Sequence, residues 1–232
     1  MVTRETNKGC ILFFVKSPEQ TTVKSRLAEA VGSEKARELY RNFVLDMLDT
    51  LSDVTARSKH DLRVCFYPPE AGQEIRDWLG SAYSCIPQQG NDLGERMQNA
   101  FLTGFGEGYR RAILLGSDTP DLTSSVITAG LSRLNTHPAV IGPAYDGGYY
   151  LLGFQSQAFL PAVFCGMPWS TGEVYACTRE VFRRAHTTVS VLPTWRDRDT
   201  IADLRDLRED GRKGNFSRSR TMRYLLEHSV TI

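Results

Sequence analysis

The stretch Arg111–Leu122, RAILLGSDTPDL, determines the fold that this sequence predicts. Its apolar run Ala112–Leu115 ends abruptly at Gly116, and Pro120 prevents a strand from continuing. A short apolar run bounded by turn residues is typical of a strand buried on both faces of a parallel sheet. Asp118 would then lie just beyond the carboxyl end of that strand, where open α/β sheets bind their ligands.

Two interpretations of Asp118 follow from this segment. Aspartate often caps turns by accepting backbone N–H groups, and that structural role is the more common one. Alternatively, its carboxylate could hold a hard divalent cation that bridges the phosphates of a nucleotide. The segment by itself leaves both interpretations open.

Length and charge limit the class of protein. The chain has 232 residues, which fits one large α/β domain, and we expect residues 1–232 to form a single domain. Lys plus Arg number 28 and Asp plus Glu number 27, so the formal charge is +1. This balance argues against nucleic acid or an anionic membrane as the main partner.

Cysteine usage and hydropathy indicate the compartment. The five cysteines include no C-x-x-C pair, which argues against a disulfide framework and a structural zinc site. The first eight residues are polar, with no signal-peptide pattern, and the longest apolar runs, such as Cys10–Val15, are too short to span a membrane. We therefore predict a cytoplasmic protein without a membrane span.

Strand-like runs alternate with helical periodicity along the chain. The predicted strands are 10–15, 62–67, 83–87, 112–115, 139–144, 151–154 and 189–192. The predicted helices are 33–55 (capped by Ser33), 70–79, 93–105 (capped by Asp92), 123–134, 157–164, 173–185, 200–207 and 216–228. This alternation predicts an α/β fold with a doubly wound, mainly parallel sheet and helices on both faces.

The segment after the first strand, Lys16–Leu27, is predicted to be a loop. Its three cations, Lys16, Lys24 and Arg26, could cradle phosphate oxygens, since lysine supplies a point charge and arginine a bidentate fork. A solvated surface loop is an equally good interpretation, because lysine and arginine are common on surfaces.

Two further loops carry candidate ligand contacts. Gln88, Gly90 and Asp92 combine an amide with a glycine, which suits contact with a nucleobase edge, although loop and cap chemistry explains them equally well. Asp146-Gly147-Gly148 allows a close backbone approach to a ligand, and an Asp-Gly hairpin turn is the strong alternative.

The predicted topology brings these loops together. In a doubly wound sheet with right-handed crossovers, the loops after the first, fourth and fifth strands lie at one edge. We therefore expect one crevice to contain Lys16, Lys24, Arg26, Gln88, Asp118, Asp146 and Asp199.

Six segments in order carry a resemblance that spans essentially the whole chain. They are VKSPEQTTVKSRL, QGNDLGERM, LLGSDTPDL, GPAYDGGYYLLG, PWST and LPTWRDRDTIADL. Together they resemble the bacterial DUF2064-like family of GT-A-type glycosyltransferases, within the nucleotide-diphospho-sugar transferase superfamily. That superfamily includes phospholactate guanylyltransferases and molybdenum-cofactor nucleotidyltransferases.

The resemblance implies a single Rossmann-like GT-A domain and a divalent ion, Mg²⁺ or Mn²⁺, on the phosphates of a nucleotide. The first metal carboxylate of the superfamily falls on Asp118, and the second falls on Asp199, with Asp197 as the alternative. One departure is Thr21, where the family usually has glycine; this narrows the conformations of the loop.

We also hypothesise roles for the remaining candidates. Asp118, Asp146 and Lys24 would be catalytic, and Asp146 would act as a base. The nucleotide- and substrate-binding set would be Lys16, Lys24, Arg26, Gln88, Gly90, Asp92, Ser117, Gly147, Gly148, Trp169, Ser170 and Thr171.

Three functions remain open at this point. We expect first a glycosyltransferase that moves a sugar from a nucleotide-diphospho-sugar to a small-molecule acceptor. The second is a nucleotidyltransferase that uses a nucleoside triphosphate and releases pyrophosphate. The third is a nucleotide-binding regulatory protein without turnover.

Overall fold

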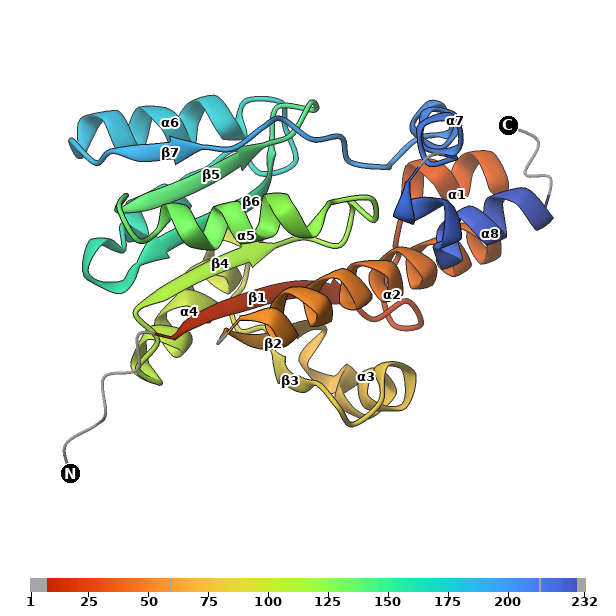
Figure 1. Cartoon of the computed structure of the whole chain (residues 1–232), viewed down its shortest axis with the longest axis horizontal. Helices are drawn as coiled ribbons and strands as arrows, with labels where there is room; N and C mark the ends of the chain where they lie inside the picture. Colours follow the sequence, from red (N-terminus) through yellow and green to blue (C-terminus); the bar gives the residue numbers. More distant parts are fainter. Residues whose placement is uncertain (1–7, 59, 213, 229–232) are drawn as a thin grey trace.

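A seven-stranded sheet forms the centre of the protein, seen in a computed structural model that describes residues 8–58, 60–212 and 214–228 (Figure 1). The polar N-terminal segment used above to argue against a signal peptide lies mostly outside these residues. The strand order is β3-β2-β1-β4-β6-β5-β7. The strands are β1 (Gly9–Lys16), β2 (Asp61–Tyr67), β3 (Ser84–Pro87), β4 (Arg111–Leu115), β5 (Ala139–Pro143), β6 (Tyr149–Gln155) and β7 (Val189–Val191).

The sheet is mainly parallel, as predicted. Strand β1 pairs in parallel with β2 and β4, β2 with β3, and β5 with β7. Strand β6 runs antiparallel to both β4 and β5. The segment Asp146–Gly148 connects β5 to β6 as a turn, so the hairpin interpretation of its Asp-Gly pair describes the backbone.

Helices cover both faces of the sheet, which confirms the doubly wound α/β architecture (Figure 1). The α-helices are α1 (Ser25–Val31), α2 (Ser33–Arg57), α3 (Gly72–Leu79), α4 (Leu93–Gly106), α5 (Ser124–Arg133), α6 (Val174–Arg184), α7 (Ile201–Asp210) and α8 (Arg220–Glu227). Short 3₁₀ turns are η1 (Pro69–Ala71), η2 (Ser156–Ala158), η3 (Pro161–Phe164) and η4 (Asn215–Arg218).

Strand β1 is buried on both faces and separates two apolar cores. Ile11 and Phe13 face a core shared with α2, α3 and α5, whereas Leu12 and Phe14 face a core shared with α4, η3 and α6. Successive side chains of a strand point to opposite faces, so the continuous apolar run Cys10–Val15 is what a central strand requires.

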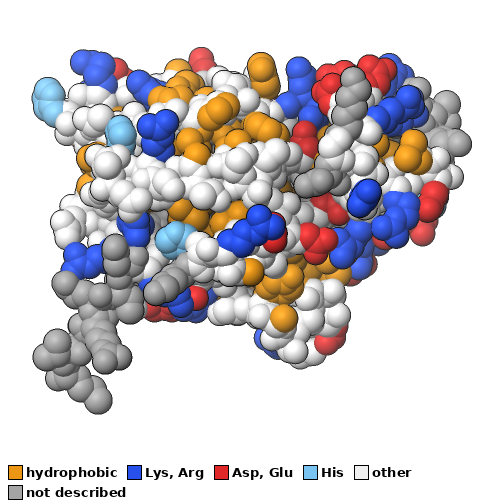
Figure 2. All heavy atoms as spheres, in the orientation of Figure 1, with side chains coloured by type: hydrophobic (Ala, Val, Ile, Leu, Met, Phe, Trp, Pro, Cys, Tyr) orange, Lys and Arg blue, Asp and Glu red, His pale blue; other side chains and the backbone are white. Residues whose placement is uncertain are grey.

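A third apolar cluster joins helices α1 and α2 to helices α7 and α8. Side chains of α1 and the start of α2 pack against α7 and α8, with Leu27, Phe43 and Leu204 fully buried. Asp46 of α2 accepts hydrogen bonds from the backbone N–H groups of residues 220 and 221, both at 2.9 Å, and so caps the start of α8. Basic and acidic side chains intermingle over this end of the molecule (Figure 2).

Several local predictions were wrong. Helix α1 begins at Ser25, inside the segment Lys16–Leu27 predicted to be a loop, and continues to Val31; its seven residues are too few to show helical periodicity in the sequence. Ser33 is the first residue of α2, and the cap is Gly32, without a side-chain hydrogen bond. The predicted helix 157–164 consists of the two short turns η2 and η3.

The strand order places a topological switch point between β1 and β4. From β1 the chain builds β2 and β3 on one side, then crosses to form β4 on the other side of β1. The loops that leave β1 and β4 therefore diverge, and a crevice opens outside their carboxyl ends. Lys16 ends β1 and Ser117-Asp118 follow β4 at this position.

Phe101→Ala should destabilise the protein by about 3–5 kcal/mol, because Phe101 is fully buried and packs against the rings of Phe105, Phe154, Phe159 and Phe164. Its neighbour on α4, Leu102, is 47% exposed, so Leu102→Ala should change stability by about 0.5 kcal/mol or less. Urea denaturation of both variants measures the difference. Equal losses would contradict the placement of α4.

Candidate functional site

A cavity of about 590 Å³ lies at the switch point. Its walls come from the ends of β1 and β4, the loop before α1, the start of α4, the β5–β6 turn, the segment 169–172 and the segment before α7. The predicted crevice is confirmed, since all seven residues expected to share it line this cavity: Lys16, Lys24, Arg26, Gln88, Asp118, Asp146 and Asp199.

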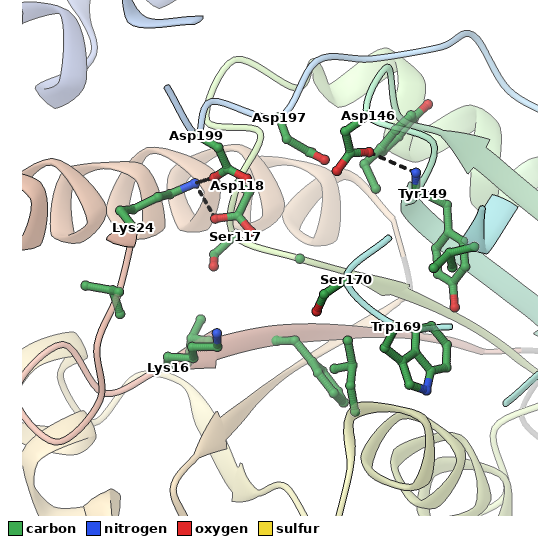
Figure 3. Close-up of a pocket in the computed structure, with 18 of the residues that line it drawn as sticks. Lys16, Lys24, Ser117, Asp118, Asp146, Tyr149, Trp169, Ser170, Asp197 and Asp199 are labelled. Atoms are coloured by element: carbon green, nitrogen blue, oxygen red, sulfur yellow. Dashed lines mark hydrogen bonds and ion pairs between the residues drawn. The ribbon is translucent and has the colours of Figure 1, made fainter. Parts of the chain in front are cut away.

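The ammonium group of Lys24 lies between two carboxylates (Figure 3). Its Nζ forms an ion pair with Asp118 Oδ1 and lies 2.7 Å from Asp199 Oδ1. The Lys24 side chain is only 2% exposed, whereas those of Asp118 and Asp199 are 46% and 36% exposed. Two acidic side chains distant in the sequence therefore contact one common cationic atom.

The backbone and surroundings of Lys24 hold it in this position. Lys24 has φ 51° and ψ 48°, a left-handed conformation that non-glycine residues rarely adopt, and it is the N-cap of α1. Its Nζ also lies 5.2 Å from the centre of the Phe43 ring on α2. The packing of α1 on α2 therefore directs this side chain toward the acidic pair.

The acidic side chains around Lys24 carry more negative charge than its single ammonium group balances. Burial alone would raise the pKa of Asp118, but the Lys24 ammonium outweighs it and holds that pKa below its usual range. Burial and the negative charges of Asp118, Asp146 and Asp199 raise the pKa of Asp197 to about 8. The arrangement therefore favours an additional cation.

A buried ion pair that sequence reasoning missed joins the loops that carry these carboxylates. Arg198 Nη2 lies 2.6 Å from Asp121 Oδ2, and the Arg198 N–H donates to the Asp118 carbonyl at 2.9 Å. A capping box between Thr200 and Asp203 then fixes the start of α7. Asp121 follows Asp118 in the same predicted turn, but no sequence signal identifies Arg198 as its partner.

The opposite wall of the cavity is aromatic and apolar. The ring centres of Tyr149 and Trp169 are 6.5 Å apart in an edge-to-face arrangement (Figure 3). Leu93 and Met97, on the first turns of α4, line the same cavity. The site thus combines a charged half with a half suited to flat or apolar ligand groups.

Most of the residues predicted to contact a ligand line the cavity, and three do not. Lining residues also include Ser117, Gly148, Trp169, Ser170, Thr171 and the alternative carboxylate Asp197. Among the described residues, Gly90, Asp92 and Gly147 are not part of the lining.

The three residues outside the lining have local roles in the backbone. Asp92 is the N-cap of α4 and accepts the Glu95 N–H at 2.8 Å. A Cβ on Gly90 would lie 2.7 Å from the backbone nitrogen of Arg96, and one on Gly147 would lie 2.0 Å from the carbonyl oxygen of Gly172. Close backbone packing therefore accounts for both glycines, and their ligand contacts stay predictions.

Two of the lining side chains make hydrogen bonds within the protein. The Gln88 amide NH₂ donates to the carbonyls of Cys65 at 2.8 Å and Val15 at 3.3 Å. Asp146 Oδ1 accepts the Gly148 N–H at 2.8 Å, which stabilises the β5–β6 turn.

The donor set fits a hard divalent cation. Asp118 and Asp199 offer carboxylate oxygens around one point, with Asp197 nearby. Within residues 8–58, 60–212 and 214–228, no group of three or more His, Cys, Asp or Glu side chains forms a ready metal cage. Mg²⁺ commonly needs no such cage, since one or two carboxylates, waters and substrate phosphates complete its shell.

Comparison with known proteins relates this fold and site to others. The family described as "Uncharacterized protein conserved in bacteria (DUF2064)" matches residues 50–171. A solved structure from Desulfovibrio desulfuricans G20, provisionally named a nucleotide-diphospho-sugar transferase, is 45% identical, with a TM-score of 0.90 and 95% of each chain covered. A search of curated proteins found none that matches.

More distant structures share the fold alone. The CMP:2-keto-3-deoxy-manno-octonic acid synthetase complexed with CTP is 12% identical, with a TM-score of 0.55, 87% of this chain and 97% of that chain covered. The 4-diphosphocytidyl-2C-methyl-D-erythritol synthase from Anaerococcus prevotii DSM 20548 is 10% identical, with a TM-score of 0.58, 88% of this chain and 98% of that chain covered. No helix of the described chain has the length and apolar character to cross a membrane.

Gly94→Ala should lower the free energy of unfolding by about 1–3 kcal/mol. The added Cβ would lie 2.6 Å from the Phe164 carbonyl oxygen and 2.9 Å from Trp169 Nε1, in the aromatic wall. Gly104, on the same helix, is the matched control: its added Cβ would meet only Tyr109 Cδ2 at 3.9 Å. Gly104→Ala should stabilise by about 0.5–1 kcal/mol. Opposite signs in denaturant unfolding support this packing, and equal signs contradict it.

Proposed function

The chain belongs to the DUF2064 family of uncharacterised bacterial proteins, and for this member we propose a metal-dependent transferase that acts on a nucleotide-activated donor. The observation that supports it most is the convergence of four carboxylates with Lys16, Lys24 and Arg26 in one cavity. Carboxylates alone would repel a phosphorylated ligand. Together with a divalent cation and basic side chains they bind one.

The proposed chemistry builds negative charge on a departing phosphate oxygen. Mg²⁺ or Mn²⁺, held by Asp118 and Asp199 with Asp197 as the alternative, would stabilise that charge as a Lewis acid. Lys16 and Arg26 would orient the phosphates, since both side chains line the same cavity. These contacts promote the reaction to the extent that they strengthen as charge develops.

Residues of the turn and the aromatic wall would hold the transferred group or the acceptor. Tyr149 and Trp169 present rings on which a sugar or an aromatic group can pack, and the hydroxyls of Ser170 and Thr171 lie beside them. Asp146 lines the same region and would accept a proton from the acceptor hydroxyl.

We place sugar transfer first, with release of a nucleoside diphosphate. The segment Ser17–Lys24 contains no glycine, unlike the glycine-rich loop typical of sugar-phosphate nucleotidyltransferases, and this favours sugar transfer. The alternative is nucleotidyl transfer with release of pyrophosphate, which the shared fold of the two synthetases favours.

The released product distinguishes these reactions. A thermal-shift screen of nucleotide-sugars and nucleoside triphosphates with Mn²⁺ first identifies the donor, since a ligand at 100 times its Kd adds about 2.7 kcal/mol of stability. Incubation of that donor with a panel of acceptors should then release a nucleoside diphosphate. Pyrophosphate would support the alternative, and tight binding without any product would support a regulatory protein.

Asp118→Asn should abolish the Mn²⁺-dependent part of nucleotide binding, because a neutral amide oxygen binds a hard cation much more weakly than a carboxylate does. The fold should persist, since the variant retains the Lys24 contact with Asp199. Calorimetry in saturating Mn²⁺ measures the affinity, and Asp92→Asn, at a carboxylate outside the cavity lining, is the matched control. Unchanged nucleotide affinity in Asp118→Asn would remove the metal assignment.

A further inference from the structure

The Lys24 ammonium stands where the proposed divalent cation would have to bind. Asp118 Oδ1 and Asp199 Oδ1 both contact Lys24 Nζ, so the point at which the two carboxylates converge is already filled by a positive charge. The side chain is almost fully buried there. A second cation that takes these same oxygens competes with the ammonium, because two positive charges at such short range repel each other.

We propose that Lys24 is a resident counter-ion of the acidic pair, which a divalent cation displaces and which then moves to the phosphates of the donor. This inference rests on the proposed function, since it assumes that Asp118 and Asp199 bind the metal. In this proposal Lys24 has two successive partners: the carboxylates before a divalent cation binds, and the phosphate oxygens of the donor afterwards.

The position of Lys24 between the two carboxylates has a clear electrostatic reason. Asp118 and Asp199 come from separate loops, which the hydrogen bond from the Arg198 N–H to the Asp118 carbonyl holds close together. Without a cation, these like charges would repel and loosen the site. Lys24 keeps the carboxylates together, so the site is preorganised before any metal arrives.

The structure also provides the means for Lys24 to leave. Its charge is carried on a flexible four-carbon stem, which lets the ammonium move by several ångströms without a change in the backbone. The surrounding lining includes Lys16 on β1 and Arg26 on the first turn of α1, the two other cations of the predicted phosphate cradle (Figure 3 shows Lys16). An ammonium released from the carboxylates therefore remains next to the place where phosphates would bind.

Lysine labelling of the unaltered protein tests this exchange directly. Amine acetylation, followed by mass spectrometry, reports the accessibility of each lysine. Lys24 should be protected in metal-free protein, should react several-fold faster with Mn²⁺ alone, and should become protected again when a nucleoside diphosphate joins Mn²⁺. A nucleoside without phosphates should not restore the protection. Lys16, whose residue is exposed, should react with or without Mn²⁺ and respond only to the diphosphate.

The Mn²⁺ affinities of two variants distinguish displacement of Lys24 by the metal from a general effect of removing a positive charge from the cavity. Lys24→Met should bind Mn²⁺ roughly tenfold or more tightly than the unaltered protein, because no ammonium has to leave. Lys16→Met is the matched control: it also removes a cavity cation whose charge acts on Asp118, but one for which the described residues show no carboxylate contact. Its Mn²⁺ affinity should rise far less. Electron paramagnetic resonance of free Mn²⁺ measures both without any turnover.

The outcomes distinguish failure of the inference from failure of the proposed function. If Mn²⁺ binds but Lys24 labelling stays unchanged and both variants gain equally, the displacement is wrong while the metal site stands. If Mn²⁺ binds neither the unaltered protein nor Lys24→Met, the metal-dependent function and the displacement both fail. If Lys24→Met does not fold, labelling of the unaltered protein still decides.

Discussion

The contact of one ammonium group with two carboxylates organises the functional end of this protein. Lys24 and Asp199 are 175 positions apart in the sequence, and Asp118 comes from a third loop. Without this cation, the loops after β1 and β4 and the segment before α7 would present mutually repelling charges. The buried Lys24 ammonium neutralises part of this negative charge.

A second buried ion pair, between Arg198 and Asp121, joins the loops that carry these carboxylates. Arg198 and Asp121 are largely buried, and the backbone of Arg198 binds the carbonyl of Asp118 directly. Breaking a buried pair by removing one partner typically costs about 3–5 kcal/mol, because the other charge is left without compensation. The two pairs have different roles: Arg198 fixes where the loops lie, whereas Lys24 occupies the space between their carboxylates.

The fold could be predicted from sequence because its decisive signals are local and long enough to read. The runs Cys10–Val15 and Ala112–Leu115 have the continuous apolar character of strands buried on both faces, and the three-four spacing in α2 extends over many turns. The failures occurred where the signal is short. Helix α1 has only seven residues, and the segment 156–164 forms 3₁₀ turns, so neither shows a full helical period.

The sequence by itself determined the class of fold and the set of polar residues that meet in one crevice, because strand burial and crossover handedness constrain which loops converge. Only the tertiary structure decided how those residues are used. In the structure, the Gln88 amide donates to backbone carbonyls, and Gly147 packs closely against Gly172. The tertiary structure also paired Lys24 with two carboxylates, a contact that depends on where separate loops meet in space and that no local pattern of residues encodes.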